Sequence, residues 1–282
     1  MKAFFRRNCL RLLIYGGLAS CLLDGFLIEP HWIKVNRLSF GDRPSMRIVH
    51  ISDIHYKGDR SYLMRIVATV NRMAPDVVCF TGDIVEQTRY LDEALDALGG
   101  INVPVYGVPG NHEYWSGASF DRIGDCLRKT GGEWLVDRSA MASKGVLLVV
   151  GRSGTEINMR RAASEFAMPG KRIEWSPAPT TIPVSSALRD SIDPGAVEPE
   201  SPAPIAPGTK RILLTHYPVD VDSIKDAKYD VILSGHAHGG QVRLPLIGAL
   251  IVPFGVNGYQ KGVYSTPAGP LHVSSGLGTF FL

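Results

Sequence analysis

The chain has 282 residues, of which 45% are hydrophobic and 20% are charged, as in an ordinary globular protein with a sizeable core. Its formal net charge is only +3. In the first forty residues, Asp24 and Glu29 are outnumbered by the basic residues Lys2, Arg6, Arg7, Arg11, Lys34 and Arg37. The rest of the chain holds 24 basic and 25 acidic residues, and this balance argues against a nucleic-acid-binding protein, which needs a basic face.

An apolar stretch, "LLIYGGLASCLLDGFLI", covers residues 12–28 and contains one charged residue, Asp24. A membrane-spanning helix needs about 20 apolar residues, so this stretch is of borderline length. The basic residues before it favour a cytoplasmic N-terminus. We therefore expect residues 1–40 to associate with the cell (inner) membrane, and the sequence leaves open on which side the rest of the chain lies.

Four interpretations fit this N-terminal segment. The first is an uncleaved anchor, and the second is a helix that lies in the membrane interface. The third is a cleaved twin-arginine export signal, and the fourth is a lipoprotein signal. "RRNCLR" resembles a twin-arginine motif, and "LASC" resembles a lipobox with Cys21 as the acylated residue. A buried helix of the globular domain fits less well, because the basic flank and the apolar run occur together at the N-terminus.

From residue 46 onward, strand and helix patterns alternate. Residues 46–55 ("MRIVHISDIH"), 76–83 ("DVVCFTGD") and 103–113 ("VPVYGVPGNHE") each predict a short apolar strand followed by polar residues. Between them, residues 63–73 and 88–100 carry apolar side chains at helical spacing. This β-α-β-α-β order predicts an α/β fold whose short strands are covered by helices.

The second half of the chain contains an interruption. Residues 145–151 ("GVLLVVG") predict another strand, but residues 152–209 hold nine of the nineteen prolines and predict an irregular surface insertion. We expect one domain over residues 46–282 that contains this insertion. Strand patterns resume at residues 210–218 ("KRILLTHYP"), 229–240 ("YDVILSGHAHGG") and 271–278 ("LHVSSGLG").

Side chains that commonly bind metals follow five of these strands. They are Asp53 and His55, Asp83, Asn111 and His112, His216, and His236 and His238. Open α/β sheets bind ligands outside the carboxyl ends of their strands, so we expect these groups to meet at one edge. Imidazole and carboxylate groups suit zinc, manganese or iron. Two such ions can clamp the attacking and leaving oxygens of a phosphoryl group, and no serine or cysteine nucleophile is then needed.

The spacing of His236 and His238 suggests a shared direction. On an extended segment, side chains at i and i+2 point to the same side. We therefore expect these two imidazoles to be presented together at the end of a strand.

In this order, "DIH", "GD", "GNHE", the lone histidine and "GHAH" resemble the motifs of the calcineurin-like metallophosphoesterase superfamily, over about residues 46–278. The resemblance implies a sandwich of two mixed sheets flanked by helices, and two divalent ions (manganese, zinc or iron). It implies that His112 contacts the phosphoryl group and protonates or stabilises the leaving oxygen. The implied ligands are Asp53, His55, Asp83 and His238 for one ion, and Asp83, Asn111, His216 and His236 for the other.

The longer string "SGHAHGGQVRLP" and the apolar N-terminus resemble a bacterial membrane-associated branch of this superfamily. That branch includes phosphodiesterases and a UDP-2,3-diacylglucosamine pyrophosphatase of lipid A synthesis. The resemblance implies hydrolysis of a phosphodiester or pyrophosphate bond, and UDP-2,3-diacylglucosamine, cut to UMP and a lipid monophosphate, is the first candidate substrate. An exported phosphodiesterase acting on envelope material and a non-catalytic binding protein on the same fold are the alternatives.

The sequence does not determine the role of a few further polar residues. Arg243 in "QVRLP" is a candidate contact for a substrate phosphate, although a surface salt bridge fits it equally well. Glu113, His50 and His272 receive no functional role from the sequence.

Overall fold

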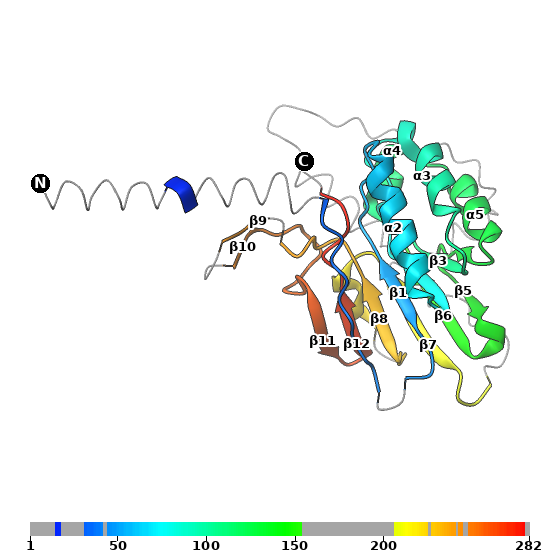
Figure 1. The fold of residues 1–282 in the computed structure, drawn as a ribbon. Coiled ribbons are helices and arrows are strands. Elements are labelled where there is room, and N and C mark those ends of the chain that lie inside the picture. The colour runs from blue at the N-terminus through cyan, green and yellow to red at the C-terminus, as the bar shows by residue number, and fades with distance from the viewer. Residues whose placement is uncertain are drawn as a thin grey trace, which may run out of the picture.

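The computed structural model describes seven parts of the chain, and the structural statements below concern these alone: residues 15–17, 31–41, 44–153, 206–224, 227–240, 242–244 and 248–279. They form an α/β sandwich of two principal sheets with helices on one side (Figure 1). The expected N-terminal apolar segment and most of the proline-rich insertion lie outside the described residues.

The first sheet has four strands in the order β1-β2-β3-β4, and all three pairings are parallel. Helices cover its outer face (Figure 1), and their apolar sides form one core cluster with residues such as Val49 and Phe80. The strands are β1 (Ile48–Ile51), β2 (Val77–Phe80), β3 (Val105–Gly107) and β4 (Glu133–Trp134). The helices are α2 (Arg60–Met73), α3 (Leu91–Leu98), α4 (Asn111–Ser116) and α5 (Phe120–Lys129).

The second sheet has six strands in the order β11-β12-β8-β7-β6-β5. Its two outer pairings are antiparallel and its inner pairings are parallel. The strands are β5 (Arg138–Ala142), β6 (Leu147–Arg152), β7 (Lys210–Thr215), β8 (Val231–Ser234), β11 (Gly262–Thr266) and β12 (Gly269–Val273). A separate antiparallel ribbon pairs β9 (Val242–Leu244) with β10 (Gly248–Ile251), and 3-10 turns occur at Thr88–Tyr90, Ser143–Gly145 and Pro218–Ser223.

The expectation of two mixed sheets is therefore confirmed for the second sheet and wrong for the described first sheet. A helix follows each of the first three strands of that sheet, and such crossovers return the chain in the parallel direction. In the second sheet, short connections join β5 to β6 and β11 to β12 at the two edges, and they produce the antiparallel pairs.

An apolar layer holds the two sheets face to face. Val77, Cys79 and Val108 pack from the first sheet, and Val149 and Leu233 pack from the second. Another apolar cluster lies on the far side of the second sheet, around Leu213 and Leu271. Inner strands such as β2 (VVCF) are buried at every position, so they are continuously apolar, and polar residues follow where these strands end.

The strands predicted from residues 46–55, 76–83, 103–113, 145–151, 210–218, 229–240 and 271–278 are confirmed, as are the helices predicted between the first three. Strands β4, β5, β9, β10 and β11 have no counterpart among the expected elements. In the described residues, no helix is long and apolar enough to cross a membrane. The membrane-associated segment stays a prediction.

Candidate metal centre

The structure brings eight of the nine predicted site residues together at the carboxyl ends of the strands. The first sheet contributes five of them and the second sheet three. All are buried except His238, which is partly buried. They are Asp53 and His55 after β1, Asp83 after β2, Asn111 and His112 at the start of α4, His216 after β7, and His236 and His238 after β8.

Five of these residues have left-handed backbone conformations. Their φ angles are 51° at Asp53, 44° at His55, 60° at Asp83, 64° at His236 and 47° at His238. Residues with a Cβ rarely adopt positive φ, and such strain gathers at functional sites. The chain thus bends sharply after β1, β2 and β8, and this bend turns polar side chains into one centre.

The expectation for His236 and His238 was wrong in its geometry. β8 ends at Ser234, so neither histidine lies on an extended strand. Their ring atoms face different partners, because Nδ1 of His236 is 3.1 Å from Nε2 of His216 and Nε2 of His238 is 3.1 Å from Nε2 of His55.

The potential ligand atoms form two groups. In group one, Nε2 of His55 lies 3.1 Å from Nε2 of His238 and 3.4 Å from Oδ2 of Asp83. Nε2 of His238 lies 3.7 Å from Oδ1 of Asp53. Ligand atoms bonded to one divalent ion at about 2.1 Å are separated by roughly 3.0–3.4 Å, so group one has nearly the spacing of a coordination shell.

Group two is built around His216. Its Nε2 atom lies 3.0 Å from Oδ1 of Asn111, 3.1 Å from Nδ1 of His236 and 3.3 Å from Oδ2 of Asp83. Oδ2 of Asp83 therefore faces a histidine of each group. Asp83 is thus shared by the two groups of potential ligands.

The hydrogen-bond partners of the histidines turn bare nitrogen atoms toward the centre. Nδ1 of His216 is 2.7 Å from the carbonyl oxygen of Thr81, and Nε2 of His236 is 2.9 Å from that of Phe254. Nδ1 of His55 is 2.8 Å from Oε2 of Glu86. Because these oxygens only accept hydrogen bonds, the ring nitrogens that face them carry the hydrogen. In the neutral ring the opposite nitrogen offers its lone pair, as a metal ligand must.

His238 differs from the other histidines. Among the residues that the structure describes, its Nδ1 atom is buried and has no hydrogen-bond partner. This ring is held by its place in the turn after β8 and by its Nε2 contacts.

The electrostatics of the centre favour a positive charge beside Asp83. Burial raises the pKa of Asp83, but His216 and His112 lower it by more, so this pKa falls well below its usual range. Burial lowers the pKa of His216, but Asp83 reverses that effect and raises it to about 10. A positive charge beside Asp83, from a proton or a metal ion, thus stabilises the site, and the donor set of imidazole, carboxylate and amide oxygen suits zinc, manganese or iron.

His112 lies beside the two groups. Its ring centroid is 4.5 Å from that of His55, and its backbone N–H donates to Oδ1 of Asp83 at 2.9 Å. Burial lowers the pKa of His112 to about 4 although Asp83 acts in the opposite direction, so this imidazole is neutral at pH 7.

Glu86 is a site residue that the sequence did not indicate. Its Oε2 atom accepts from His55 and lies 3.4 Å from Nδ1 of His112. One carboxylate thus orients a potential ligand and the neighbouring His112. Glu86 stands outside every quoted motif, and its position after "GDIV" is the only sequence signal that could have suggested it.

Glu113 shapes the turn that presents Asp83. It is fully buried and accepts hydrogen bonds from the backbone N–H groups of Asp83, Ile84 and Gly110 at 2.8, 2.6 and 2.7 Å. A Cβ atom on Gly110 would lie 2.1 Å from Oδ1 of Asp83, so only glycine fits there. The carboxylate of "GNHE" therefore has a structural role that the sequence alone did not reveal.

The ninth predicted residue, Arg243, lies in β9, and its side chain is outside the described part of the structure. Its proposed contact with a substrate phosphate stays a prediction.

The fold and this centre define a metallophosphoesterase. The chain belongs to the calcineurin-like phosphoesterase family, because the sequence pattern of that family matches its residues 46–240. The expected resemblance is thereby confirmed. Members of this superfamily are generally metal-dependent hydrolases, which agrees with the donor set at the strand ends.

Curated relatives are similar to this chain at low identity. The uncharacterised metallophosphoesterase YkuE of Bacillus subtilis is 26% identical, over 99% of this chain and 92% of its own length. The UDP-2,3-diacylglucosamine pyrophosphatase LpxG of Chlamydia muridarum is 24% identical, over 77% of this chain and 73% of its own. The phosphodiesterase YaeI of Escherichia coli is 22% identical, over 90% of this chain and 84% of its own.

Proposed function

We propose that this chain is a two-metal phosphoesterase that hydrolyses a phosphodiester or pyrophosphate bond. The observation that carries the proposal is the convergence of two groups of ligand-type atoms on Oδ2 of Asp83. Group one would hold one divalent ion and group two the other. Such ions, of manganese, zinc or iron, polarise phosphoryl oxygens and activate water for attack.

The chain itself would supply orientation and leaving-group stabilisation. His112 is buried beside both groups, and as a neutral imidazole it can donate an N–H hydrogen bond to the leaving oxygen; it can transfer a proton to that oxygen only after it has itself been protonated. Glu86 keeps His112 and His55 in place. Because Asp83 lies between these histidines and His216, it would align both groups with one phosphoryl centre.

The substrate that we propose is UDP-2,3-diacylglucosamine, cut to UMP and a lipid monophosphate. Two similar proteins, from Chlamydia muridarum and Chlamydia trachomatis, carry the name UDP-2,3-diacylglucosamine pyrophosphatase, which supports this choice. The apolar stretch at residues 12–28 would bring the domain to a lipid surface at the cell membrane. Since this substrate is made in the cytoplasm, the proposal requires the domain to lie on the cytoplasmic side.

An exported phosphodiesterase acting on envelope material is the second candidate. It is favoured by the twin-arginine-like "RRNCLR" and by the similarity to the phosphodiesterase of Escherichia coli. The two candidates share the same metal centre and differ in substrate and membrane side.

The test is release of UMP from UDP-2,3-diacylglucosamine by the full-length chain with Mn²⁺. The His112→Ala variant is expected to lose about 10²- to 10⁴-fold in turnover, the usual contribution of acid–base catalysis, while it still binds Mn²⁺. His31→Ala is the matched control, because His31 is exposed and precedes the first sheet. Hydrolysis of an aryl phosphodiester without UMP release would favour the second candidate, and full turnover in His112→Ala would contradict the role of His112.

A further inference from the structure

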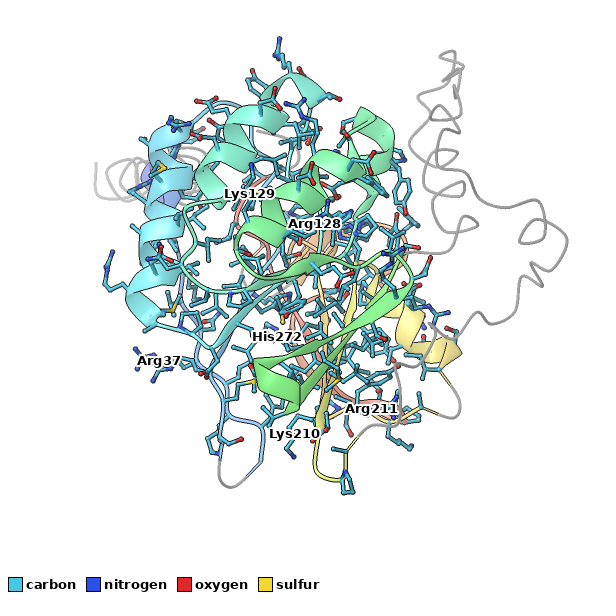
Figure 2. All side chains as sticks on the ribbon, turned by 90° about the vertical axis from the view of Figure 1, so that its right-hand side faces the viewer. Arg37, Arg128, Lys129, Lys210, Arg211 and His272 are labelled. Atoms are coloured by element: carbon cyan, nitrogen blue, oxygen red, sulfur yellow. The ribbon has the colours of Figure 1, made fainter. Side chains whose placement is uncertain are left out.

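Two histidines that belong to neither metal group meet between the sheets. His50 lies on β1 of the first sheet and His272 on β12 of the second, and their Nδ1 atoms are 3.0 Å apart. Their strand neighbours Cys79 and Leu233 belong to the apolar layer between the sheets. Figure 2 shows His272 within the body of the molecule. A polar pair in an apolar layer costs free energy unless its hydrogen bonds are made.

A series of hydrogen bonds leads from this pair to the metal centre. Nε2 of His50 is 2.9 Å from Oγ1 of Thr81. The Thr81 hydroxyl donates to Oγ of Ser52 at 2.7 Å, and the Ser52 hydroxyl donates to Oδ2 of Asp53 at 2.5 Å. We name this series the inter-sheet chain. Its members, in order, are His272, His50, Thr81, Ser52 and Asp53.

The direction of every hydrogen bond in the inter-sheet chain follows from its carboxylate end. An ionised carboxylate only accepts, so Ser52 donates to Asp53 and accepts from Thr81. Thr81 has then used its one hydroxyl hydrogen, and Nε2–H of His50 must donate to it. Burial lowers the pKa of His50 and of His272, so each ring is neutral at pH 7 and has one N–H. Nδ1 of His50 must therefore accept, and Nδ1–H of His272 donates.

All four hydrogen bonds thus point toward Asp53. Hydrogen bonds aligned in series polarise one another, so those far from Asp53 strengthen the last one. This last bond fixes Oδ2, while Oδ1 of Asp53 lies 3.7 Å from Nε2 of His238 in group one. The backbone N–H of His236 approaches both oxygens, at 3.0 and 3.2 Å, and limits rotation of the carboxylate further.

We propose that the inter-sheet chain positions Asp53, holding Oδ2 in place and presenting Oδ1 to the ion of group one; this inference rests on the proposed two-metal function. Its histidines and hydroxyls are positioning residues, since they act through Asp53. The inter-sheet chain crosses from one sheet to the other, so it links the packing of the two sheets to the position of the Asp53 carboxylate. Second-shell partners of a ligand commonly change metal affinity by about 10- to 100-fold.

The sharpest test breaks the inter-sheet chain at its middle. Thr81→Val replaces the hydroxyl with a methyl group of similar size, whereas Thr81→Ser keeps the hydroxyl. Both retain the Thr81 carbonyl that accepts from His216 at 2.7 Å, so group two keeps its support. In calorimetric titration of the full chain with Mn²⁺ alone, Thr81→Val is expected to weaken one of two binding steps by about 10-fold or more, and Thr81→Ser is expected to match the parent.

A second variant tests transmission along the chain. His272→Leu removes the far end, which lies 222 residues from His50 in sequence and belongs to neither metal group. It is expected to weaken the same binding step by a smaller factor, about two- to tenfold. Cys79→Ala is the control, because Cys79 is buried on the strand next to His50 and takes no part in the chain. It is expected to lower the melting temperature and leave Mn²⁺ binding unchanged.

The outcomes separate this inference from the proposed function. Parent-like binding of both ions by Thr81→Val, or equal losses in Cys79→Ala and His272→Leu, would overturn the positioning role and leave the two-metal proposal standing. If the parent chain bound no Mn²⁺, both proposals would fall. Selective weakening of one step in Thr81→Val and His272→Leu would support the inter-sheet chain.

Discussion

The two sheets bring different chemistry to the same centre. Among the potential ligands in the described part of the chain, the first sheet supplies the oxygen atoms, from Asp53, Asp83 and Asn111, whereas the second sheet supplies imidazoles alone. Group one needs His238 from the second sheet, and group two needs Asn111 from the first. Neither sheet holds a full group by itself. The centre therefore exists only when the sandwich is closed, and a bound ion would stabilise that closed state.

The interior of the sandwich and its carboxyl edge also differ in backbone conformation and in the polarity of their buried side chains. Between the sheets, extended strands pack apolar side chains such as Val77 and Val149 with ordinary geometry. At the edge, residues such as Asp53 and Asp83 are buried, charged and left-handed in φ. Both features cost free energy, and the packed interior offsets them. The edge is thus specialised for binding, and the interior for stability.

Removing the negative charge of Asp83, which lies between the two groups, should have the largest effect on turnover. Asp83→Asn leaves an uncharged oxygen between His55 and His216, and we expect hydrolysis of an aryl phosphodiester to fall by about 10³-fold or more, because metal-based stabilisation is worth several kcal/mol. Metal content, measured by elemental analysis, should fall as well. Asp76→Asn, at an exposed carboxylate beside β2, is the control. Normal turnover in Asp83→Asn would show that the groups act independently.

A substitution at Gly110 tests how closely this residue must pack against the carboxylate of Asp83. In Gly110→Ala the new Cβ atom would overlap Oδ1 of Asp83, and we expect about a 10²-fold loss of turnover, as for a displacement of about 1 Å at a reacting centre. Gly124→Ala on α5 is the matched control, since its Cβ meets only the flexible end of Arg128 at 3.1 Å. That variant should keep full turnover and gain up to about 1 kcal/mol in the free energy of unfolding. Equal activity of both variants would contradict the crowding at Asp83.

Glu86 tests whether the first sheet depends on support from outside its ligands. Glu86→Ala removes the acceptor of the His55 Nδ1–H, and we expect Mn²⁺ affinity to fall by about 10- to 100-fold. Glu86→Gln keeps an acceptor oxygen and removes the charge. An intermediate affinity in Glu86→Gln would separate the hydrogen bond from the charge, and parent-like affinity in Glu86→Ala would remove Glu86 from the site.

The melting temperature should rise when Mn²⁺ binds between the two sheets. Mn²⁺ at about 100 times its dissociation constant adds about 2.7 kcal/mol for each bound ion, or a rise of roughly 5–10 °C in a chain of this size. His236→Ala removes a potential ligand that the second sheet contributes and should reduce this rise, whereas His31→Ala should keep it. A rise of the same size in all three proteins would place the bound ions elsewhere.

Much of the centre was predictable because its residues follow a local pattern. An apolar run that ends in a polar motif, as in "DVVCFTGD", marks both a buried strand and the side chain at its carboxyl end. That is why Asp83, and likewise Asn111 and His216, could be named in advance. The turn geometry of His236 and His238 could not, because φ depends on the contacts that the chain makes after it leaves the sheet.

The sequence by itself determined the family, the α/β order and the side chains at the strand ends, because each depends on residues that are neighbours in the chain. Only the tertiary structure decided which of them share a group, and which partners orient them. Glu86 is 31 residues from His55, Thr81 is 135 from His216, and His272 is 222 from His50. Such contacts exist because two sheets pack face to face, and no short-range pattern in the sequence records that packing.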